Sequence, residues 1–276
     1  MRDKTCVITG ANSGIGLETA RGLARLGARV ILVCRDRGKG EAARRELIQS
    51  TGNGQIHLLI ADLASLDAVR RLAGEIQASC PRLDVLIHNA GLMCKTRQVS
   101  ADGHEMQLAV HFLAPFLLTD LLLDLLKHSA PARVILVSSR LHQFARIHFD
   151  DLQCRKKYRL MRAYGQSKLA ALLYTYELAA RLRGTGVTAN ALHPGVVATN
   201  IGMPEWLAPF IATPEKGART SIHLASAPEL EKVTGKYFVG CREAKSSRRS
   251  HDRTAGRRLW AVAEKLCGKT TDGSGE

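Results

Sequence analysis

The sequence predicts an α/β protein with a single domain, built on a doubly wound parallel sheet with helices on both faces. Short apolar runs recur along the 276 residues, and stretches long enough to form amphipathic helices separate them. Strands that alternate with helices in this way pair in parallel through right-handed crossovers. The length also suits one domain with a substantial core.

Six apolar segments are predicted to form the strands of this sheet. Each is short and ends in polar or glycine residues, as expected for strands that are buried on both faces. The predicted strands are residues 6–8, 28–33, 56–60, 83–87, 133–137 and 187–192.

The segments between the strands are predicted to be helices. The first follows the glycines at 10–16 and places Ala20, Leu23 and Ala24 at helical spacing. The other predicted helices are residues 38–50, 65–79, 103–127 and 164–183, with a further one that begins near Pro214.

A glycine turn joins the first strand to its helix. Gly10, Gly14 and Gly16 have the spacing G-x-x-x-G-x-G, which differs from the G-x-G-x-x-G fingerprint. Such a turn brings backbone N–H groups and the positive end of a helix close to a pyrophosphate. The turn therefore indicates a Rossmann-type, dinucleotide-binding sheet, and an ordinary tight turn is the alternative interpretation.

The residues after the second strand bear on the choice of cofactor. An arginine at this position accommodates the 2′-phosphate of NADP, whereas an acidic residue binds the 2′-hydroxyl of NAD. Arg35 and Arg37 favour NADP(H), and Asp36 is the opposing signal, one place beyond the expected strand end. A solvated surface charge is the alternative interpretation of either arginine.

Tyr164 and Lys168 lie four residues apart in a predicted helix and therefore share one face of it. A lysine near a phenol favours the phenolate. A tyrosine that ordinarily ionises near pH ~10 could then exchange a proton with an alcohol or carbonyl at neutral pH. The pair is frequent by chance, so a half-buried tyrosine beside a solvated lysine is the alternative interpretation.

The motifs of the chain, taken in order, resemble those of the short-chain dehydrogenase/reductase family, and most closely its retinol dehydrogenase branch. The family motifs are TGANSGIG at 9–16, DLA at 62–64, NAG at 89–91, SS at 138–139, Tyr164-x-x-x-Lys168 and HPG at 193–195. The branch is indicated by CRDR at 34–37, PRLDVLIHNAG at 81–91, FLLT at 116–119, HFDDLQ at 148–153, SKLA at 167–170 and RRLWAVAEKLCG at 257–268.

The resemblance implies a role for particular residues. Ser139 would bond the substrate oxygen, Tyr164 would be the catalytic acid/base, and Lys168 would bond the nicotinamide ribose and lower the tyrosine pKa. Asp62 would face the adenine, and Asn89 the adenine-side ribose. Gly10, Ser13, Gly14, Ile15 and Gly16 would line the pyrophosphate, and Pro194, Gly195, Val197 and Thr199 would meet the nicotinamide.

The chain departs from the family pattern at His111, where relatives carry asparagine in V-N-H-x-G. In the family, that asparagine shapes a helix distortion whose backbone carbonyl holds a water beside the active lysine. Pro115 cannot donate to the carbonyl of His111, and its ring clashes with that carbonyl, so a distortion is predicted by another route. The alternative interpretation of His111 is a half-buried helix histidine with no catalytic task.

The resemblance implies a hydrophobic substrate pair, retinol and retinal. The segment between Thr199 and Pro214 is shorter than in relatives but is still expected to form an apolar lid. Steroids or lipid aldehydes remain alternative substrates, and a catalytically weak scaffold or cofactor sensor remains an alternative function. The lid residues are Met203, Trp206, Leu207, Pro209, Phe210 and Ile211.

Composition narrows the classes of site and partner. Seven scattered cysteines lack a C-x-x-C and ten histidines lack an H-E-x-x-H, so no metal and no disulfide framework are expected. The formal net charge of +15 fits a solvated basic face or contact with an anionic membrane surface. No motif for nucleic acid accompanies the charge, so we expect no nucleic-acid partner.

The same features bear on location and domain limits. No secretory signal and no apolar run of about 18 residues is present, and the N-terminal anchor of the relatives is not seen. We therefore expect an intracellular protein of the cytosol or of the cytosolic face of a membrane such as the endoplasmic reticulum. Peripheral membrane contact and a homodimer remain open. Residues 1–268 are expected to form the domain and residues 269–276 a disordered tail.

Overall fold

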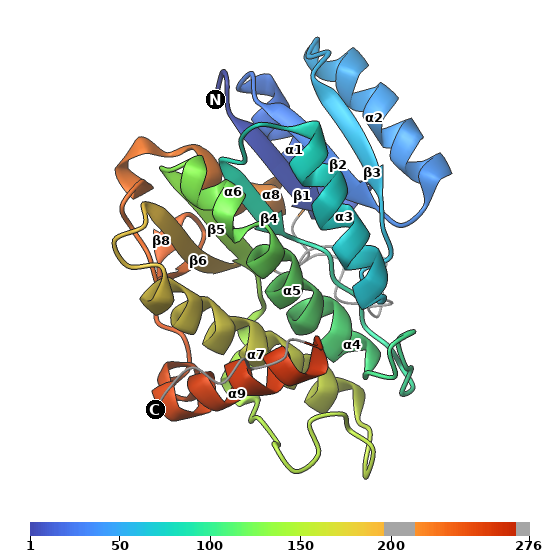
Figure 1. Ribbon diagram of the computed structural model, residues 1–276, viewed down its shortest axis with the longest axis vertical. Helices are drawn as coiled ribbons and strands as arrows, with labels where there is room; N and C mark the ends of the chain where they lie inside the picture. The colour runs from blue at the N-terminus through green and yellow to red at the C-terminus, as the bar shows by residue number, and fades with distance from the viewer. Residues whose placement is uncertain (196–212, 269–276) are drawn as a thin grey trace.

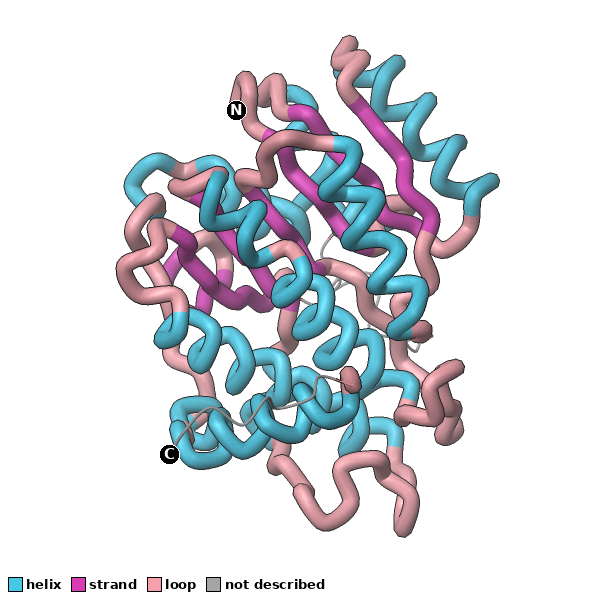
Figure 2. The backbone as a smooth tube through the Cα atoms, viewed as in Figure 1, coloured by secondary structure: helices cyan, strands magenta, loops and turns pink. Residues whose placement is uncertain are grey.

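A computed structural model describes residues 1–195 and 213–268 of the protein. Within these residues the strands form one sheet between two layers of helices, as Figures 1 and 2 show. The predicted α/β fold is therefore confirmed. The strands are β1 Thr5–Thr9, β2 Arg29–Cys34, β3 Ile56–Ile60, β4 Val85–His88, β5 Ala132–Val137, β6 Val187–His193, β7 Tyr237–Val239 and β8 Arg242–Glu243.

The strand order is β3-β2-β1-β4-β5-β6-β7-β8, so the chain reverses its direction of winding between β1 and β4. Every pairing from β3 to β7 is parallel, and β8 pairs antiparallel with β7. The six predicted strands are present, whereas β7 and β8 were not predicted because runs of three and two residues carry no periodic pattern. Open parallel sheets bind ligands at such a switch point, beyond the carboxyl ends of the strands.

Successive side chains of the strands point to opposite faces of the sheet. In β1, Cys6 and Ile8 lie in the apolar cluster with helices α1, α2 and α8, whereas Val7 lies in the cluster with α3, α5 and α7. Both faces are thus apolar, which explains the unbroken hydrophobic runs. The helices are α1 Gly14–Arg25, α2 Arg37–Thr51, α3 Leu66–Ser79, α4 Met106–Leu108, α5 Ala114–Leu121, α6 Leu123–His128, α7 Leu160–Arg181, α8 Pro214–Ser226 and α9 Arg253–Leu266.

The predicted helix at 103–127 is not continuous. After the short α4, residues Ala109–Leu113 form a π-helical segment in which the N–H of Ala114 donates to the carbonyl of Ala109. The helix then resumes as α5, with Pro115 in its first turn, and breaks again at Leu122 before α6. The distortion predicted from Pro115 is present, because a proline lacks the N–H that a regular turn needs here.

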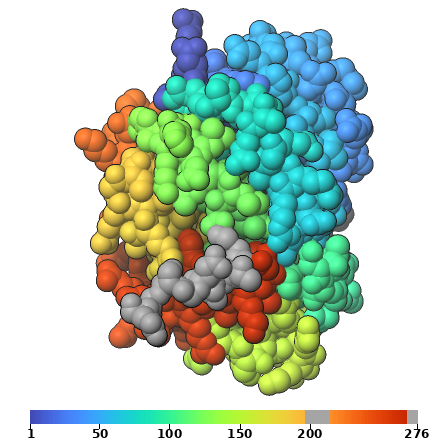
Figure 3. Space-filling view, in the orientation of Figure 1, coloured from blue at the N-terminus to red at the C-terminus, as the bar shows by residue number. Residues whose placement is uncertain are grey.

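Aromatic side chains pack α9 against α5 and α7. The Trp260 ring lies 4.9 Å from the Phe116 ring of α5 and 5.7 Å from the Tyr174 ring of α7, centroid to centroid. The Arg181 guanidinium lies 4.1 Å from the Trp260 ring. Figure 3 shows the red C-terminal segment on this face, beside the green and yellow segments. These contacts hold α9 against α5 and α7.

None of the helices within residues 1–195 and 213–268 is long and apolar enough to span a membrane.

Candidate active site

Ser139 and Tyr164 come together beyond the carboxyl end of β5. Ser139 is the second residue after that strand and caps a short 3-10 helix, where its hydroxyl accepts from the N–H of Leu141 at 3.3 Å. Tyr164 lies in the second turn of α7. Burial raises the pKa of Tyr164, while a hydrogen bond from Ser139 acts to lower it. The phenol is therefore protonated at neutral pH in the unliganded site.

Lys168 lies one turn further along α7 and is almost completely buried, with 4% of its surface exposed. Its Nζ donates to the carbonyl of Val137 at 3.1 Å and lies 5.6 Å from the centroid of the Tyr164 ring. Burial lowers the pKa of Lys168 to about 8. The expected proximity of cation and phenol is present, but burial has the largest effect on the Tyr164 pKa. A lowering of that pKa by Lys168 stays a prediction.

The glycine turn between β1 and α1 has the geometry that an anion site needs. Gly10 and Gly14 adopt φ of +65° and +56°, a region that other residues rarely occupy. A Cβ on Gly16 would lie 2.2 Å from the carbonyl oxygen of Gly10, so the turn closes only without a side chain there. Ser13 caps α1 without a side-chain hydrogen bond, and the first turn holds no acidic residue.

The first turn of α1 is therefore open to a negatively charged group. Its N–H groups carry the partial positive charge of the helix end, and neither the Ser13 side chain nor a carboxylate within the turn competes for them. Ile15 lies within this turn, between Gly14 and Gly16. The residues predicted to line a pyrophosphate thus fit such a group.

Asn89 connects the loop after β4 to this turn. Its side-chain nitrogen donates to the carbonyls of Thr9 and Gly10 at 2.9 and 3.1 Å. The Thr9 hydroxyl in turn accepts from the N–H groups of Asn89 and Ala90, both at 3.0 Å. The amide therefore holds the glycine turn, and the predicted ribose contact of Asn89 stays a prediction.

The charged residues after β2 and β3 are exposed, and one of them, Asp36, also caps a helix. Asp36 caps α2, where its carboxylate accepts from the N–H of Lys39 at 2.9 Å. Arg35 is exposed and makes no hydrogen bond or ion pair with the part of the chain that is described. Asp62 is exposed, and its carboxylate accepts from the N–H of Ala64 at 3.0 Å. The presence of Asp36, which opposed the assignment of NADP(H), is thus explained by its role as the N-cap of α2.

His111 lies in the π-helical segment and is buried, with 3% of its surface exposed. Its Nδ1 lies 2.8 Å from the Ser167 hydroxyl, and its Nε2 accepts from the N–H of Leu92 at 3.0 Å. The ring also meets the Tyr164 ring edge to face, 5.5 Å between centroids. Burial, followed by the charge of Lys168, lowers the His111 pKa well below its ordinary value.

These contacts correct the interpretation of His111 as a half-buried side chain. Ser167 and Leu92 were not predicted as parts of the site. Ser167 could have been suspected because it lies inside the Tyr164–Lys168 spacing. Leu92 takes part through its backbone, which leaves no signal in the residue type.

The nicotinamide side is described only in part. Pro194 and Gly195 directly follow β6 and are half-buried, and Gly195 has φ of +93°. Val197, Thr199 and the predicted lid residues Met203, Trp206, Leu207, Pro209, Phe210 and Ile211 lie outside the described residues, as does the predicted tail at 269–276.

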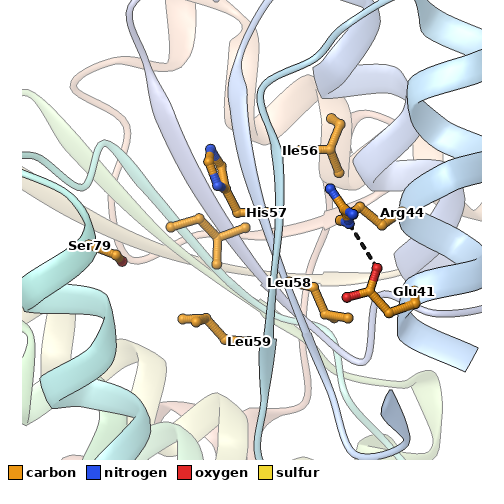
Figure 4. Close-up of a pocket in the computed structure, with 8 residues that line it drawn as sticks. Glu41, Arg44, Ile56, His57, Leu58, Leu59 and Ser79 are labelled. Atoms are coloured by element: carbon orange, nitrogen blue, oxygen red, sulfur yellow. Dashed lines mark hydrogen bonds and ion pairs between the residues drawn. The ribbon is translucent and has the colours of Figure 1, made fainter. Parts of the chain in front are cut away.

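One hollow on the described part of the chain lies away from these side chains. It has a volume of about 240 Å³ beside the edge strand β3, next to the ion pair between Glu41 and Arg44 (Figure 4). None of the predicted site residues lines it. In the described ranges, no three His, Cys, Asp or Glu side chains are grouped so as to hold a metal ion.

Comparison with known proteins gives consistent matches along the chain. Residues 4–208 match the family described as short chain dehydrogenase. Human retinol dehydrogenase 14 is 46% identical over 293 residues, which cover 97% of this chain and 87% of that protein.

Solved structures match over similar lengths. The crystal structure of an uncharacterized protein from Mycobacterium paratuberculosis is 39% identical, with a TM-score of 0.81 over 97% of this chain and 94% of that one. The Pseudomonas aeruginosa RhlG/NADP active-site complex is 27% identical, with a TM-score of 0.71 over 86% and 94% of the two chains.

Proposed function

The chain belongs to the short chain dehydrogenase family, and from this premise we propose that it is an NADP(H)-dependent oxidoreductase. It interconverts a hydrophobic alcohol with its aldehyde or ketone, and retinol with retinal is the leading pair. The observation that carries the proposal is the convergence of Ser139, Tyr164 and Lys168 at the carboxyl edge of the sheet, the edge at which the glycine turn after β1 also lies.

The cofactor assignment rests on the turn and on the end of β2. Gly10, Gly14 and Gly16 leave the first N–H groups of α1 open to a pyrophosphate. Arg35 is exposed where the 2′-phosphate of NADP lies in this type of fold. The Pseudomonas aeruginosa relative in complex with NADP supports the same assignment.

Three side chains carry the proton chemistry. When bound, the nicotinamide cofactor supplies hydride transfer to or from the carbon that bears the oxygen. The Ser139 hydroxyl donates a hydrogen bond to the substrate oxygen. Tyr164 donates its proton to that oxygen in reduction and takes it back in oxidation. The cation of Lys168 favours the phenolate that Tyr164 becomes when it has given up its proton.

The protonation state of the unliganded site suits the reductive direction. Burial raises the pKa of Tyr164, so the phenol holds the proton that it must donate. Oxidation needs the phenolate, which the nearby cation of Lys168 would favour.

The substrate class comes from the relatives. A sequence 46% identical to human retinol dehydrogenase 14 over 97% of this chain supports a long apolar alcohol or aldehyde of the retinol type. Steroid ketones and medium-chain aldehydes are the alternative substrates, because the apolar residues of the segment 199–214 are compatible with either.

The proposal is tested by following the absorbance of NADPH with retinal, a steroid ketone and a medium-chain aldehyde, each in parallel with NADH. We expect the highest kcat/KM with retinal and NADPH, and loss of most of this activity in Ser139→Ala. Activity with steroid ketones alone would show that a steroid, and not retinal, is the substrate. No turnover with any carbonyl, despite measurable NADPH binding, would leave a cofactor-binding protein in place of an enzyme.

A further inference from the structure

The imidazole of His111 uses both of its nitrogens inside the site. Nε2 faces the backbone N–H of Leu92 at 3.0 Å, and Nδ1 faces the hydroxyl of Ser167 at 2.8 Å. The Ser167 hydroxyl also donates to the carbonyl of Tyr164 at 2.8 Å. One side chain therefore joins the loop after β4 to the turn of α7 that carries Tyr164.

The backbone donor determines where the ring proton lies. A backbone N–H can only donate, so Nε2 must be unprotonated and accept from Leu92. A neutral imidazole then carries its proton on Nδ1 and donates it to the Ser167 oxygen. The Ser167 proton is in turn accepted by the carbonyl of Tyr164. Every donor along this chain meets an acceptor, so the buried network is fully satisfied.

A charged ring would break the same network. Protonation would turn Nε2 into a donor facing the Leu92 donor, and would place a second cation beside Lys168 in a buried site. The two cations would lie near each other, because a Cβ on Gly91 would be in ordinary contact with both Nε2 of His111, at 3.4 Å, and Nζ of Lys168, at 3.6 Å. Nε2 of His111 and Nζ of Lys168 thus border the same residue of the loop. Both ring nitrogens of His111 already have hydrogen-bond partners, so neither is free to relay a proton.

We propose that His111 is a positioning residue, whose neutral Nδ1–H imidazole clamps the Tyr164–Lys168 turn of α7 to the loop at 91–92. Its catalytic meaning rests on the oxidoreductase function proposed above. Pro115 bears only on the backbone carbonyl of residue 111, to which it cannot donate a hydrogen bond. The contacts of both ring nitrogens assign a separate task to the side chain. Misplaced reacting groups lose rate even when they are chemically intact.

Three substitutions separate the two ends of the clamp. An asparagine amide ends at the level of Nδ1 and retains the contact to Ser167, whereas a glutamine amide ends at the level of Nε2 and retains the contact to Leu92. His111→Phe retains the edge contact with the Tyr164 ring and removes both hydrogen bonds. We expect kcat to fall by about 10–100-fold in His111→Phe, and by less in His111→Asn and His111→Gln. NADPH affinity should change by less than about threefold in all three.

The Ser167→Ala substitution tests whether the hydrogen bonds act as one unit. It should lower kcat in the wild-type and His111→Asn backgrounds, and add little in His111→Phe and His111→Gln, where the Nδ1 contact is already gone. A merely structural role predicts additive losses that follow the melting temperature and affect kcat and KM alike. That result would overturn the proposal. If His111→Phe does not fold, the effect of Ser167→Ala on kcat in the His111→Asn and His111→Gln backgrounds still tests the proposal.

A measurement independent of activity tests the tautomer. In protein labelled with ¹⁵N-histidine, the His111 signals are identified by their absence from His111→Gln. We expect a protonated Nδ1 and an unprotonated Nε2 at neutral pH. A proton on Nε2, or a charged ring, would overturn the clamp whatever the enzyme activity. The expected tautomer in a protein that turns over no carbonyl would instead overturn the proposed function alone.

Discussion

The glycine turn and the chemical centre meet at one edge of the sheet but are built in opposite ways. At the turn the backbone makes the site, and a single added Cβ at Gly16 would collide with the Gly10 carbonyl. At the centre, the side chains of His111, Tyr164 and Lys168 make the site; His111 and Lys168 are buried and Tyr164 is half-buried. The glycine turn has no room for added side chains, whereas the chemical centre holds ionisable groups away from water.

This difference determines where each region is vulnerable. Burial raises the pKa of Tyr164 and lowers that of Lys168 to about 8, so desolvation opposes charge on both groups. The centre therefore holds groups that cost stability and that the chemistry needs. The turn has no such conflict, because its shape serves both folding and anion binding. Substitutions in the two regions should then fail in different measurements.

The largest effect should come from Tyr164→Phe. The substitution removes the proton donor and retains the ring that meets His111, so turnover should fall by about 10²–10⁴-fold. NADPH affinity, followed by fluorescence titration, should remain unchanged because the glycine turn is intact. Turnover within a few-fold of the wild type would mean that the centre does not depend on this phenol.

Arg35→Ala should affect the cofactor side and leave the centre intact. Loss of a charge-assisted hydrogen bond to the 2′-phosphate should lower affinity for NADPH by about 10–100-fold, with little change for NADH. Arg45→Ala removes the same charge from the middle of α2 and serves as the matched control. Equal use of both cofactors by the unmutated protein would contradict this assignment.

Lys168→Met should abolish most turnover yet stabilise the unliganded protein by about 1–3 kcal/mol. Burial lowers the Lys168 pKa from 10.5 to about 8, so between these values the unfolded chain binds more protons than the folded one. The cost is fully present below pH about 8 and is relieved as pH rises toward 10.5.

Urea unfolding of the wild type and Lys168→Met across this pH range measures that cost directly. The stability advantage of the variant should shrink as the pH rises. An advantage that does not change with pH would show that the lysine charge is not what costs stability.

The smallest effects should come from a pair of glycines. Gly16→Ala forces a Cβ to within 2.2 Å of the Gly10 carbonyl and should destabilise the fold by about 1–3 kcal/mol, with weaker NADPH binding. Gly74→Ala in α3 meets nothing within 4 Å and should stabilise by about 0.5–1 kcal/mol. Thermal unfolding of both variants compares them, and equal shifts would refute the steric argument.

The sequence alone was sufficient for the parallel sheet, the glycine turn and the Tyr164–Lys168 pair. Each depends on residues close together in the chain, because hydrophobic period, glycine spacing and helical spacing are local properties. Such patterns gave the six longer strands and most helices to within a few residues. They failed at β7 and β8, which are too short to show a period.

Only the tertiary structure decided what surrounds the pair. His111 meets Leu92 from 19 residues away and Ser167 from 56 residues away, and no local pattern encodes such partners. Lys168 looked like a solvated cation in one interpretation, yet the packing of α7 against the sheet buries it and lowers its pKa to about 8. The residue types were visible in the sequence, but burial and long-range hydrogen bonds, which give these groups their protonation states, exist only once the chain has folded.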